Sequence, residues 1–533
     1  MSREKNDRID EAVEVGPNPM RLGLHSYRAV MRDPVHGLVP LNELEYRIVQ
    51  SNVLRRLHGI SQLGLMRLVY PGASHTRFEH SIGVMHLMGV AANMVVIQAG
   101  REKTLCEALF QECTEENKGF FVQVARLVGL LHDVGHLPFS HHFELGLDYA
   151  INRLGARIDL SWHQGSIKKI HETITMHLIE RLAGKMSDFN SYLPYVKAVL
   201  YGTDDFEGPI SHGAVNVLRN LISGTVDLDR LDYILRDSHH AGVVYGRVHV
   251  DRLISMIRLL PRDKTIRLVY DVKGISALED LYDARLKLYR WLYLHHKSAA
   301  FYIALGHIIA EMSRWDGWGH VPDAASLEEL LKPETLTSNI VSGQYYFDEH
   351  DFESMARLMA STGRGARWVK AIYEHRELLP VSMIKRPEDL VVSVIVERPE
   401  RTLTKMYKRY EDPEERFAFE ERIKEAHKRM IRRKVIQDCG TEPEIEVVAV
   451  YLQVESGKGE GGVEVVASSG DVLSVEKASR YLARLYEYAR EPIIYVYEYS
   501  DNECIHRVIR ESRGRLSKKI LEELPRKPIK RMV

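Results

Sequence analysis

A short apolar segment that carries an unusual number of titratable side chains constrains this sequence most. Residues 127–144, LVGLLHDVGHLPFSHHFE, are apolar enough to belong to a core, yet they include His132, Asp133, His136 and a histidine pair at 141–142. Burying that many titratable groups is unfavourable unless each has a partner. Because a metal ion satisfies several such groups together, the segment predicts a buried metal centre.

The spacing of these residues predicts where the helix that carries them ends. His132 and His136 lie one turn apart on the same helix face. Asp133 is rotated by about 100° from His132, so both reach one metal ion only where the helix is distorted or meets other helices. Gly135 and Pro138 are suited to end the helix there. The remaining ligands must therefore come from other helices.

Two further segments carry ligand-type residues on predicted helices. HTRFEHS, residues 75–81, offers two histidines and a glutamate, and DLDRLDYILRDSHH, residues 227–240, offers four aspartates. Two histidines with two carboxylates, and no thiolate, suit Mn, Fe, Zn or Mg, so the ligand set does not identify the metal. The alternative is that these residues are capped or hydrogen-bonded polar groups of the core, which explains any one of them but not three clusters together.

The apolar spacing divides the chain into a long helical part and a mixed C-terminal part. A length of 533 residues indicates two or more domains. From Leu41 to Pro380 apolar residues recur at three and four positions, which predicts helices. Strand-like and helix-like segments then alternate in the order β-α-β-β-α-β, which suits a small ferredoxin-like module.

We therefore predict a mainly α fold, in which a multi-helix core is followed by an α+β module. The expected boundaries are 1–25 for a flexible N-terminal tail, 26–385 for the helical domain, 386–500 for the α+β module and 501–533 for a basic helical tail.

Charge and composition give no reason to expect a membrane or nucleic acid as the main partner. The formal net charge is −1, the N-terminal residues are polar and charged, and the longest apolar run, 84–100, is interrupted by polar side chains. That run suits a buried helix better than a bilayer span. The residues after 504 are basic, which is typical of a solvated helix end but leaves open a weak contact with an anionic partner such as RNA.

The cysteines bear on the compartment in which the protein folds. Cys106, Cys113, Cys439 and Cys504 have neither the spacing of a metal site nor that of a redox motif. We interpret them as buried or incidental thiols in a reducing compartment, and we expect the protein in the cytoplasm.

Taken in order, HTRFEHS, LLHDVGHLPFSH and DLDRLDYILRDSHH resemble the motifs of the HD-domain metal-dependent phosphohydrolases. Within that superfamily they are most similar to the deoxynucleoside triphosphate triphosphohydrolases of the SAM-and-HD-domain type. The likeness is strong from residues 32–42 through 62–84 to 289–297 and continues weakly to about residue 385. After that, the chain matches the family only in the kind of module, an α/β one. It implies a helical HD-domain core, a divalent metal cofactor, a deoxynucleoside triphosphate (dNTP) substrate and a homo-oligomer.

Position by position, the resemblance implies the residues of the metal centre and of the chemistry beside it. It implies four metal ligands: His80, His132, Asp133 and Asp229. His136 and His141 would contact the region of the α-phosphate, and Glu144 would orient a catalytic histidine and select its tautomer. We choose His171 in IHETI as that histidine, while His163 in WHQGS is a nearby competitor.

The resemblance also implies how the phosphates of a nucleotide would be held. A triphosphate carries about four negative charges and needs fixed cations. Three arginines match phosphate contacts of the family: Arg77, Arg230 and Arg285. The alternative for each is an ordinary solvated arginine.

The sugar side of the expected site follows the same helix as one metal ligand. Asp229, Tyr233 and Asp237 recur every four residues and so share one helix face. Tyr233 would offer a hydroxyl to phosphate or sugar, and in the family the carboxylate at Asp237 reads the sugar 3′-hydroxyl. Tyr293 matches a tyrosine that stacks on the sugar. Two neighbouring residues match the pair that lies against the ribose: Gln62 and Leu63.

Three positions depart from the family pattern. Tyr289 stands where the best-known members have a histidine near the phosphates, so the sequence does not identify the group that protonates the leaving oxygen. Gln50 and His58 stand where nucleotide-activated members place an acidic and a basic residue for an activating guanine. We therefore do not expect activation by GTP or dGTP.

The expected reaction is hydrolysis of a dNTP at its α-phosphorus, giving deoxynucleoside and inorganic triphosphate. Two alternatives stay open. One is a nucleotidase or phosphodiesterase that acts on other phosphoesters, against which the three arginines argue, because a monophosphate needs fewer cations. The other is a nucleic-acid-binding protein that uses its basic tail and α+β module while the metal is structural.

Overall fold

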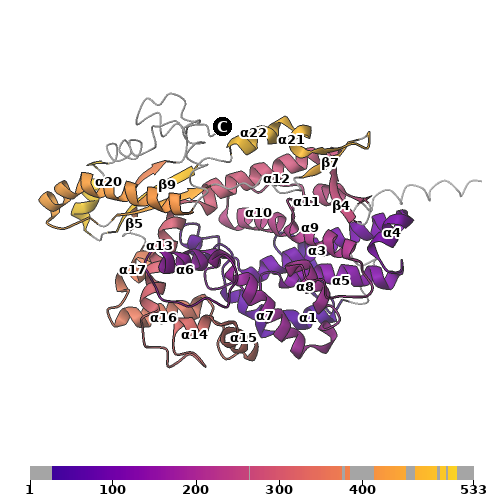
Figure 1. Cartoon of the computed structure of the whole chain (residues 1–533), viewed down its shortest axis with the longest axis horizontal. Helices are drawn as coiled ribbons and strands as arrows, with labels where there is room; N and C mark the ends of the chain where they lie inside the picture. The colour runs from indigo at the N-terminus through magenta and orange to yellow at the C-terminus, as the bar shows by residue number, and fades with distance from the viewer. Residues whose placement is uncertain are drawn as a thin grey trace, which may run out of the picture.

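The computed structural model describes most of the chain (Figure 1). The described residues are 27–262, 265–374, 378–384, 413–443, 445–451, 463–467, 469–488, 492–499, 502–509 and 511–512. Within these ranges helices dominate and three small sheets accompany them, so the predicted fold class, mainly α with a C-terminal α+β part, is confirmed. The predicted tail 1–25 and the end of the basic tail beyond residue 512 lie outside the described residues.

Helix α3 (Arg77–Arg101) lies at the centre of the helical body and packs along α5 (Glu115–Leu131). It begins at a capping box in which the backbone N–H of Thr76 donates to Oε2 of Glu79 at 2.5 Å. By length and composition α3 is apolar enough to cross a membrane, but 72% of its most apolar window is buried inside the molecule, which is typical of a core helix. The apolar run 84–100 therefore belongs to a buried helix, as predicted.

Three other packing relationships bring the motifs together. α10 (Leu228–Ala241) packs against α3, and α6 (His141–Asn152) packs against α13 (His296–Met312). α12 (Ile275–Leu288) continues directly into a π-helical turn at Tyr289–Tyr293, a local irregularity that is frequent at functional sites. The other α-helices of this part are α1 (Glu43–Val49), α2 (Asn52–Arg55), α4 (Lys103–Leu109), α7 (Ile170–Lys185), α8 (Leu193–Tyr201), α9 (His212–Ser223), α11 (Val250–Ser255), α14 (Leu327–Leu331), α15 (Pro333–Ser342), α16 (Glu349–Ser361) and α17 (Ala366–Glu374).

The strands form three separate sheets. The first is an antiparallel hairpin of β1 (Ala29–Asp33) and β2 (Gly37–Leu41). The second has the order β3-β4-β7-β8 and consists of Ile257–Arg262, Thr265–Asp271, Glu464–Val466 and Val472–Ser474. The third has the order β5-β9-β6 and consists of Leu378–Ile384, Pro492–Tyr499 and Ile445–Tyr451.

The ferredoxin-like arrangement predicted for the C-terminal module does not match this pairing. A ferredoxin-like module would place its strands in one sheet. Instead β7 pairs in parallel with β4, with Tyr270 opposite Val465, while β6 and β9 pair with each other and β9 also pairs with β5. Strand pairing joins segments far apart in sequence, so the order of the elements alone could not reveal it. The first strand expected in the module, within 388–397, lies outside the described residues.

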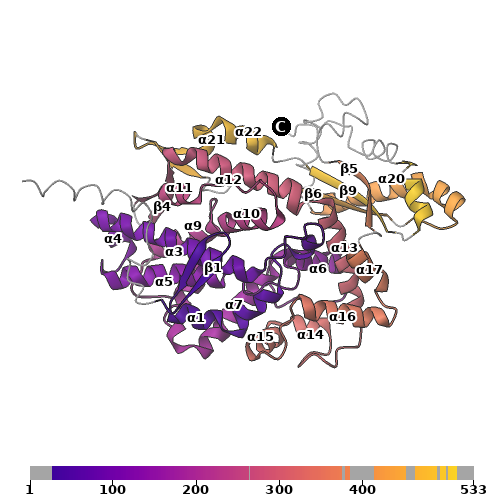
Figure 2. The same ribbon diagram turned by 180° about the vertical axis from the view of Figure 1, so that it is seen from behind.

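The described C-terminal helices pack against their own sheet and against the helical body. α20 (Pro413–Cys439) packs on β6, and α21 (Val475–Ala478) and α22 (Arg480–Tyr488) lie beside α12 in both views (Figures 1 and 2). The hydroxyl of Tyr481 donates to Oδ1 of Asp283 on α12 at 3.1 Å. The C-terminal part therefore rests on the helix that leads into the π-helical turn.

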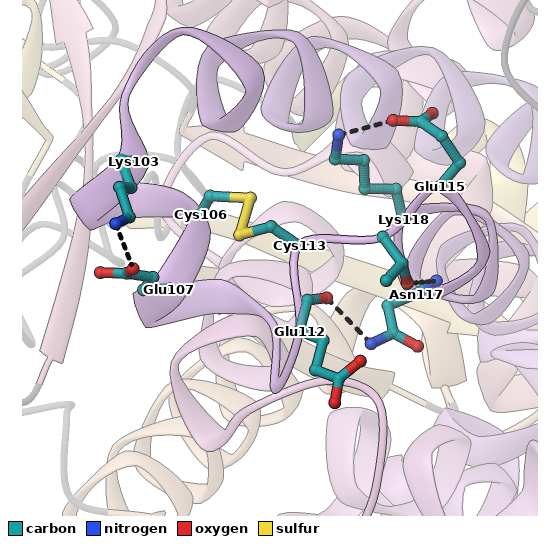
Figure 3. Close-up of a disulfide and its surroundings, with 9 residues drawn as sticks. Lys103, Cys106, Glu107, Glu112, Cys113, Glu115, Asn117 and Lys118 are labelled. Carbon is teal, nitrogen blue, oxygen red and sulfur yellow. Dashed lines mark hydrogen bonds and ion pairs between the residues drawn. A yellow bond between two sulfur atoms is a disulfide. The ribbon is translucent and has the colours of Figure 1, made fainter.

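The interpretation of the cysteines as free thiols is wrong. Cys106 on α4 is disulfide-bonded to Cys113 in the loop before α5 (Figure 3), and Cys439 is disulfide-bonded to Cys504. Beside this first disulfide, Nδ2 of Asn117 on α5 donates to the carbonyl of Glu112 at 2.9 Å (Figure 3). Pairing depends on proximity in the fold, which sequence spacing did not indicate. Disulfides are typical of oxidising compartments and of intracellular proteins of hyperthermophiles, so the cysteines do not support a reducing compartment.

Candidate active site

Three helices bring four potential metal ligands to one point. His80 lies in the first turn of α3, His132 caps the C-terminal end of α5 and is followed by Asp133, and Asp229 lies in the first turn of α10. Nε2 of His80 is 3.0 Å from Oδ1 of Asp229 and 3.6 Å from Oδ2 of Asp133. Nε2 of His132 is 3.7 Å and 3.5 Å from the same two oxygens. Two ring nitrogens and two carboxylate oxygens therefore converge from helices far apart in sequence.

The unpaired nitrogens of this cluster fit a divalent metal. Nε2 of His80 and Nε2 of His132 are buried and have no hydrogen-bond partner among the described residues, although carboxylate oxygens lie near them. The opposite nitrogens are occupied, because Nδ1 of His80 bonds Oδ2 of Asp232 at 2.7 Å and Nδ1 of His132 bonds the carbonyl of Gly129 at 2.9 Å. A histidine held at Nδ1 with a bare Nε2 is the arrangement expected of a metal ligand.

The electrostatics of the cluster favour a cation. Burial alone would lower the pKa of His80, but Asp229 and Asp232 together raise it to about 10. Burial alone would raise the pKa of Asp133, but His132 and Arg77 lower it well below its usual range. The carboxylates thus stay ionised in a buried place and attract positive charge, which a divalent metal would supply.

A second cluster of histidines lies beside the first. Oε1 of Glu144 is 2.5 Å from Nδ1 of His171, and Oε2 of the same carboxylate is 2.8 Å from Nδ1 of His141. His136 stacks on His171 with ring centroids 3.9 Å apart, and its Nε2 is 3.4 Å from Oδ1 of Asp133. The expected catalytic residues are therefore brought together, and Asp133 faces both clusters.

The geometry distinguishes the chosen histidine, His171, from its competitor His163. His171 contacts Glu144, whereas Nδ1 of His163 bonds Oγ1 of Thr173 at 2.8 Å and its Nε2 bonds the carbonyl of Ser166 at 2.9 Å. Both ring nitrogens of His163 are thus engaged near its own loop. Burial alone would lower the pKa of His171, but Glu144 raises it, so the ring is held ready to carry a proton.

The three predicted arginines differ in their contacts. Arg77 forms an ion pair with the metal-cluster residue Asp133. Arg285 is only 4% exposed, its guanidinium lies 5.5 Å from the ring centre of Tyr289, and its Nε and one terminal nitrogen are buried without a partner among the described residues. Arg230 instead donates to the carbonyl of Thr225 at 2.7 Å and faces Asp227. Arg285 is therefore the arginine whose charge is left for a ligand.

The residues predicted for the sugar side form a hydrogen-bonded group. The hydroxyl of Tyr293 donates to Oδ2 of Asp237 at 2.6 Å, and Nε2 of His75 bonds Oδ1 at 2.7 Å. The rings of Tyr233 and Tyr293 approach edge to face, with centroids 6.1 Å apart. Gln62 is buried, and its Oε1 has no partner within the described chain. Leu63 is buried beside it in the sequence.

Sequence reasoning did not find the supporting roles of two residues. Asp232 was considered as a ligand, but it bonds His80, Nε2 of His36 at 2.6 Å and the guanidinium of Arg236 instead. Its place among the four aspartates of residues 227–240 was the available signal. Glu349 on α16 contacts segments near both clusters, and no sequence signal identified it.

Comparison with known proteins agrees with this geometry. Residues 77–237 match the model of the HD domain, a range that includes all four residues of the metal cluster. HD domains bind divalent metals. An uncharacterized protein of Methanocaldococcus jannaschii is 31% identical over 266 residues, which cover 50% of this chain and 46% of that protein.

Two other relatives are informative. The human deoxynucleoside triphosphate triphosphohydrolase SAMHD1 is 29% identical over 287 residues, covering 50% of this chain and 42% of that protein. An uncharacterized protein of Mycoplasma pneumoniae is 26% identical over 336 residues, covering 61% of this chain and 71% of that protein. The chain thus spans less than half the length of the first two relatives.

Proposed function

We propose that the chain hydrolyses dNTPs to deoxynucleoside and inorganic triphosphate, on the premise that the match of residues 77–237 to the HD domain indicates a hydrolase of the HD superfamily. The similarity to a named deoxynucleoside triphosphate triphosphohydrolase supports the proposal, although it covers half of this chain.

The buried guanidinium nitrogens of Arg285 that lack hydrogen-bond partners among the described residues are the observation that carries the proposal. A guanidinium that is 4% exposed and lacks a partner for two of its nitrogens, within the part of the chain that the structure describes, is unfavourable. Bound phosphate would supply the missing acceptors. Arg77 adds a second buried cation beside the metal cluster. Two buried arginines, one of them paired with Asp133 of the metal cluster, suit a polyphosphate better than a single phosphate.

The proposed chemistry divides between the metal and the side chains around it. His80, His132, Asp133 and Asp229 would hold a divalent metal, which when bound would supply Lewis-acid polarisation of phosphate and activation of water. Because Nδ1 of His171 faces Glu144, its Nε2 is the atom that would give a proton to the departing 5′-oxygen. His136 stacks on His171 and keeps the ring in place, while Arg77 and Arg285 offset negative charge on the phosphates.

The sugar-side group supports a preference for a deoxynucleoside. Asp237 is held by His75 and Tyr293, and each carboxylate oxygen retains a lone pair that would accept a 3′-hydroxyl. Gln62 and Leu63 would lie against the sugar at its 2′ position. Self-association, a cytoplasmic location and a weak nucleic-acid contact of the basic tail stay predictions from the sequence.

Product analysis tests the proposal. The purified chain would be incubated with each dNTP and NTP and with Mn²⁺ or Mg²⁺, and the phosphate species released would be identified by mass spectrometry. We expect inorganic triphosphate and deoxynucleoside from dNTPs, lost in Asp133→Ala and with chelator but kept in His163→Asn, whose ring lies outside the cluster. Release of monophosphate instead would favour a nucleotidase or phosphodiesterase. No turnover of any nucleotide would overturn the proposal.

A further inference from the structure

The first residue of α16 joins two segments of the site through one buried carboxylate. Glu349 is 4% exposed. Its Oε1 accepts the backbone N–H of Ser61 at 2.8 Å, the hydroxyl of Ser61, and the backbone N–H of Phe139 at 3.2 Å. Its Oε2 lies 3.2 Å from the guanidinium of Arg67. One side chain thus connects the segment that carries Gln62 with the turn that leads into α6.

That turn has an unusual backbone conformation. Phe139 and Ser140 have φ angles of 60° and 54°, and Phe347, two residues before Glu349, has a φ of 47°. These are three of the four non-glycine residues with positive φ in the described chain. Such conformations persist only where the surroundings determine them, and they cluster at functional sites. The rings of Phe139 and Phe352 meet edge to face at 5.6 Å, which packs the turn against α16.

From the turn, a short chain of contacts leads to the metal cluster. The hydroxyl of Ser140 donates to the carbonyl of Ser61 at 2.7 Å and accepts from Nε of Arg77 at 2.9 Å. Arg77 in turn forms the ion pair with Asp133. A change at Glu349 can therefore reach a metal-cluster residue through a short series of direct contacts.

A second link runs from residues 346–347, just before Glu349, to the loop that follows α5. The buried guanidinium of Arg56 donates to the carbonyls of Tyr346 at 2.5 Å and Phe347 at 3.2 Å, and to the carbonyl of Val134 at 3.3 Å. Val134 directly follows the metal-cluster residue Asp133. Residues 346–349 are therefore tied to the metal-cluster loop on one side and to the segment of Gln62 on the other.

We propose that Glu349 is a positioning residue of this site, which holds the Ser61–Leu63 segment and the Phe139–Ser140 turn in register with the metal cluster. Its hydrogen bonds go to these two segments rather than to the four metal ligands, and on the proposed function it does not touch the nucleotide. The inference rests on the proposed function for the substrate, but its effect on metal binding does not depend on that substrate.

Glu353 provides a matched control for this proposal. It lies one helical turn further along α16 and contacts the same guanidinium, because the terminal nitrogen of Arg67 donates to Oε1 of Glu353 at 2.8 Å. Glu349 bonds both site segments, whereas Glu353 contacts Arg67 and Tyr373. Glu349→Gln and Glu353→Gln each remove one negative charge beside Arg67, but only Glu349 bonds the two site segments.

The experiment compares metal affinity, kcat, KM and Tm in the two variants. Metal affinity is measured by Mn²⁺ titration of the chelated protein. We expect Glu349→Gln to lower kcat by about tenfold or more with a smaller change in KM, and to weaken Mn²⁺ binding, while Glu353→Gln matches the wild type. Equal effects of the two substitutions, or wild-type kcat and Mn²⁺ affinity in Glu349→Gln, would overturn the proposal.

Ser140→Ala keeps the test decisive where Glu349→Gln folds poorly. It removes the link between the turn and Arg77 without changing the charge, and we expect the same fall in kcat and in Mn²⁺ affinity. In a double variant the two effects should combine to less than their product, because both act through one path. Independent effects would contradict that path. Absence of dNTP hydrolysis in the wild type would reject the proposed function, whereas the Mn²⁺ comparison would still decide the role of Glu349.

Discussion

Nδ1 of His80 donates a hydrogen bond to Oδ2 of Asp232 at 2.7 Å, and Asp232 is itself held by the guanidinium of Arg236. The carboxylate therefore fixes a proton on Nδ1 of His80 and leaves Nε2, which faces Asp229, as the nitrogen available to a metal. An outer carboxylate of this kind raises the basicity of its histidine and orients it for a metal.

Replacing Asp232 with asparagine should weaken divalent metal binding by about 10- to 100-fold, because the amide orients His80 less well. Titration with Mn²⁺ measures the affinity, and Asp251→Asn, an exposed aspartate on α11, controls for the lost charge. An unchanged affinity in Asp232→Asn would show that His80 needs no such support.

His171→Asn should lower kcat by about 10²- to 10⁴-fold while KM changes little, because the residue is expected to act on the leaving oxygen rather than on binding. His163→Asn should behave as the wild type, since both ring nitrogens of His163 are engaged near its own loop. Steady-state release of inorganic triphosphate measures both. A larger loss in the His163 variant would reverse the assignment.

Arg285→Gln should raise KM, because a charged donor to phosphate is worth about 1.5–3 kcal/mol, or about 10- to 100-fold in affinity. Arg258→Gln is the control, since Arg258 forms an ion pair with Asp271 on β4. Isothermal titration with a non-hydrolysable dNTP in both variants gives the affinity directly. Equal affinity in the two would mean that Arg285 does not contact phosphate.

The side chain of His307 should make the free energy of unfolding fall at acid pH. Burial and the nearby cation Arg367 lower the pKa of His307 in the folded protein to about 3. The unfolded chain takes up this proton near pH 6.5, so the stabilisation is complete above that pH and is lost as the pH falls toward 3.

The loss from this single group amounts to about 1.4 kcal/mol per pH unit within that window. His307 stacks on Trp368 with ring centroids 3.7 Å apart, and phenylalanine keeps a stacking ring without a titrating group. Urea unfolding between about pH 3 and pH 7 should therefore show a shallower fall in stability for His307→Phe. A parallel pair of pH curves would contradict the assignment.

The two disulfides should stabilise the folded protein to different extents. Cys439–Cys504 spans 65 residues and Cys106–Cys113 spans 7, so loop entropy assigns them about 4 and about 2 kcal/mol, respectively. Thermal unfolding should show a larger decrease in Tm for Cys439→Ser than for Cys106→Ser. Thiol counting in the unreduced protein checks the pairing, and reaction of all the cysteines would refute it.

Much of the metal centre could be predicted because its ligands fall in short motifs. The pair His132-Asp133 and the apolar helix before it indicate a buried polar group, and the helical spacing places Asp229 and Asp237 on one face of α10. The structure brings these motifs together as expected. The contact between His171 and Glu144 joins residues on different helices, so the sequence chose His171 but left His163 as a competitor, and the contact itself needed the fold.

The predictions that failed concern strand partners and disulfide partners, which depend on contacts between residues far apart in sequence. Alternating strands and helices near the C-terminus suggested one sheet, but β7 found a partner in β4 instead. Cys439 and Cys504 lie far apart in sequence and meet only in the folded chain.

The sequence by itself determined which residue types are available for the chemistry and on which helices they lie, because helical periodicity and turn residues act over a few positions. Only the tertiary structure decided which of them meet. Glu349 shows the difference, since its carboxylate bonds Ser61 and Phe139 across separations that no local pattern encodes. A buried carboxylate needs donors within hydrogen-bonding distance, and the packing of α16 against the two site segments is what supplies them.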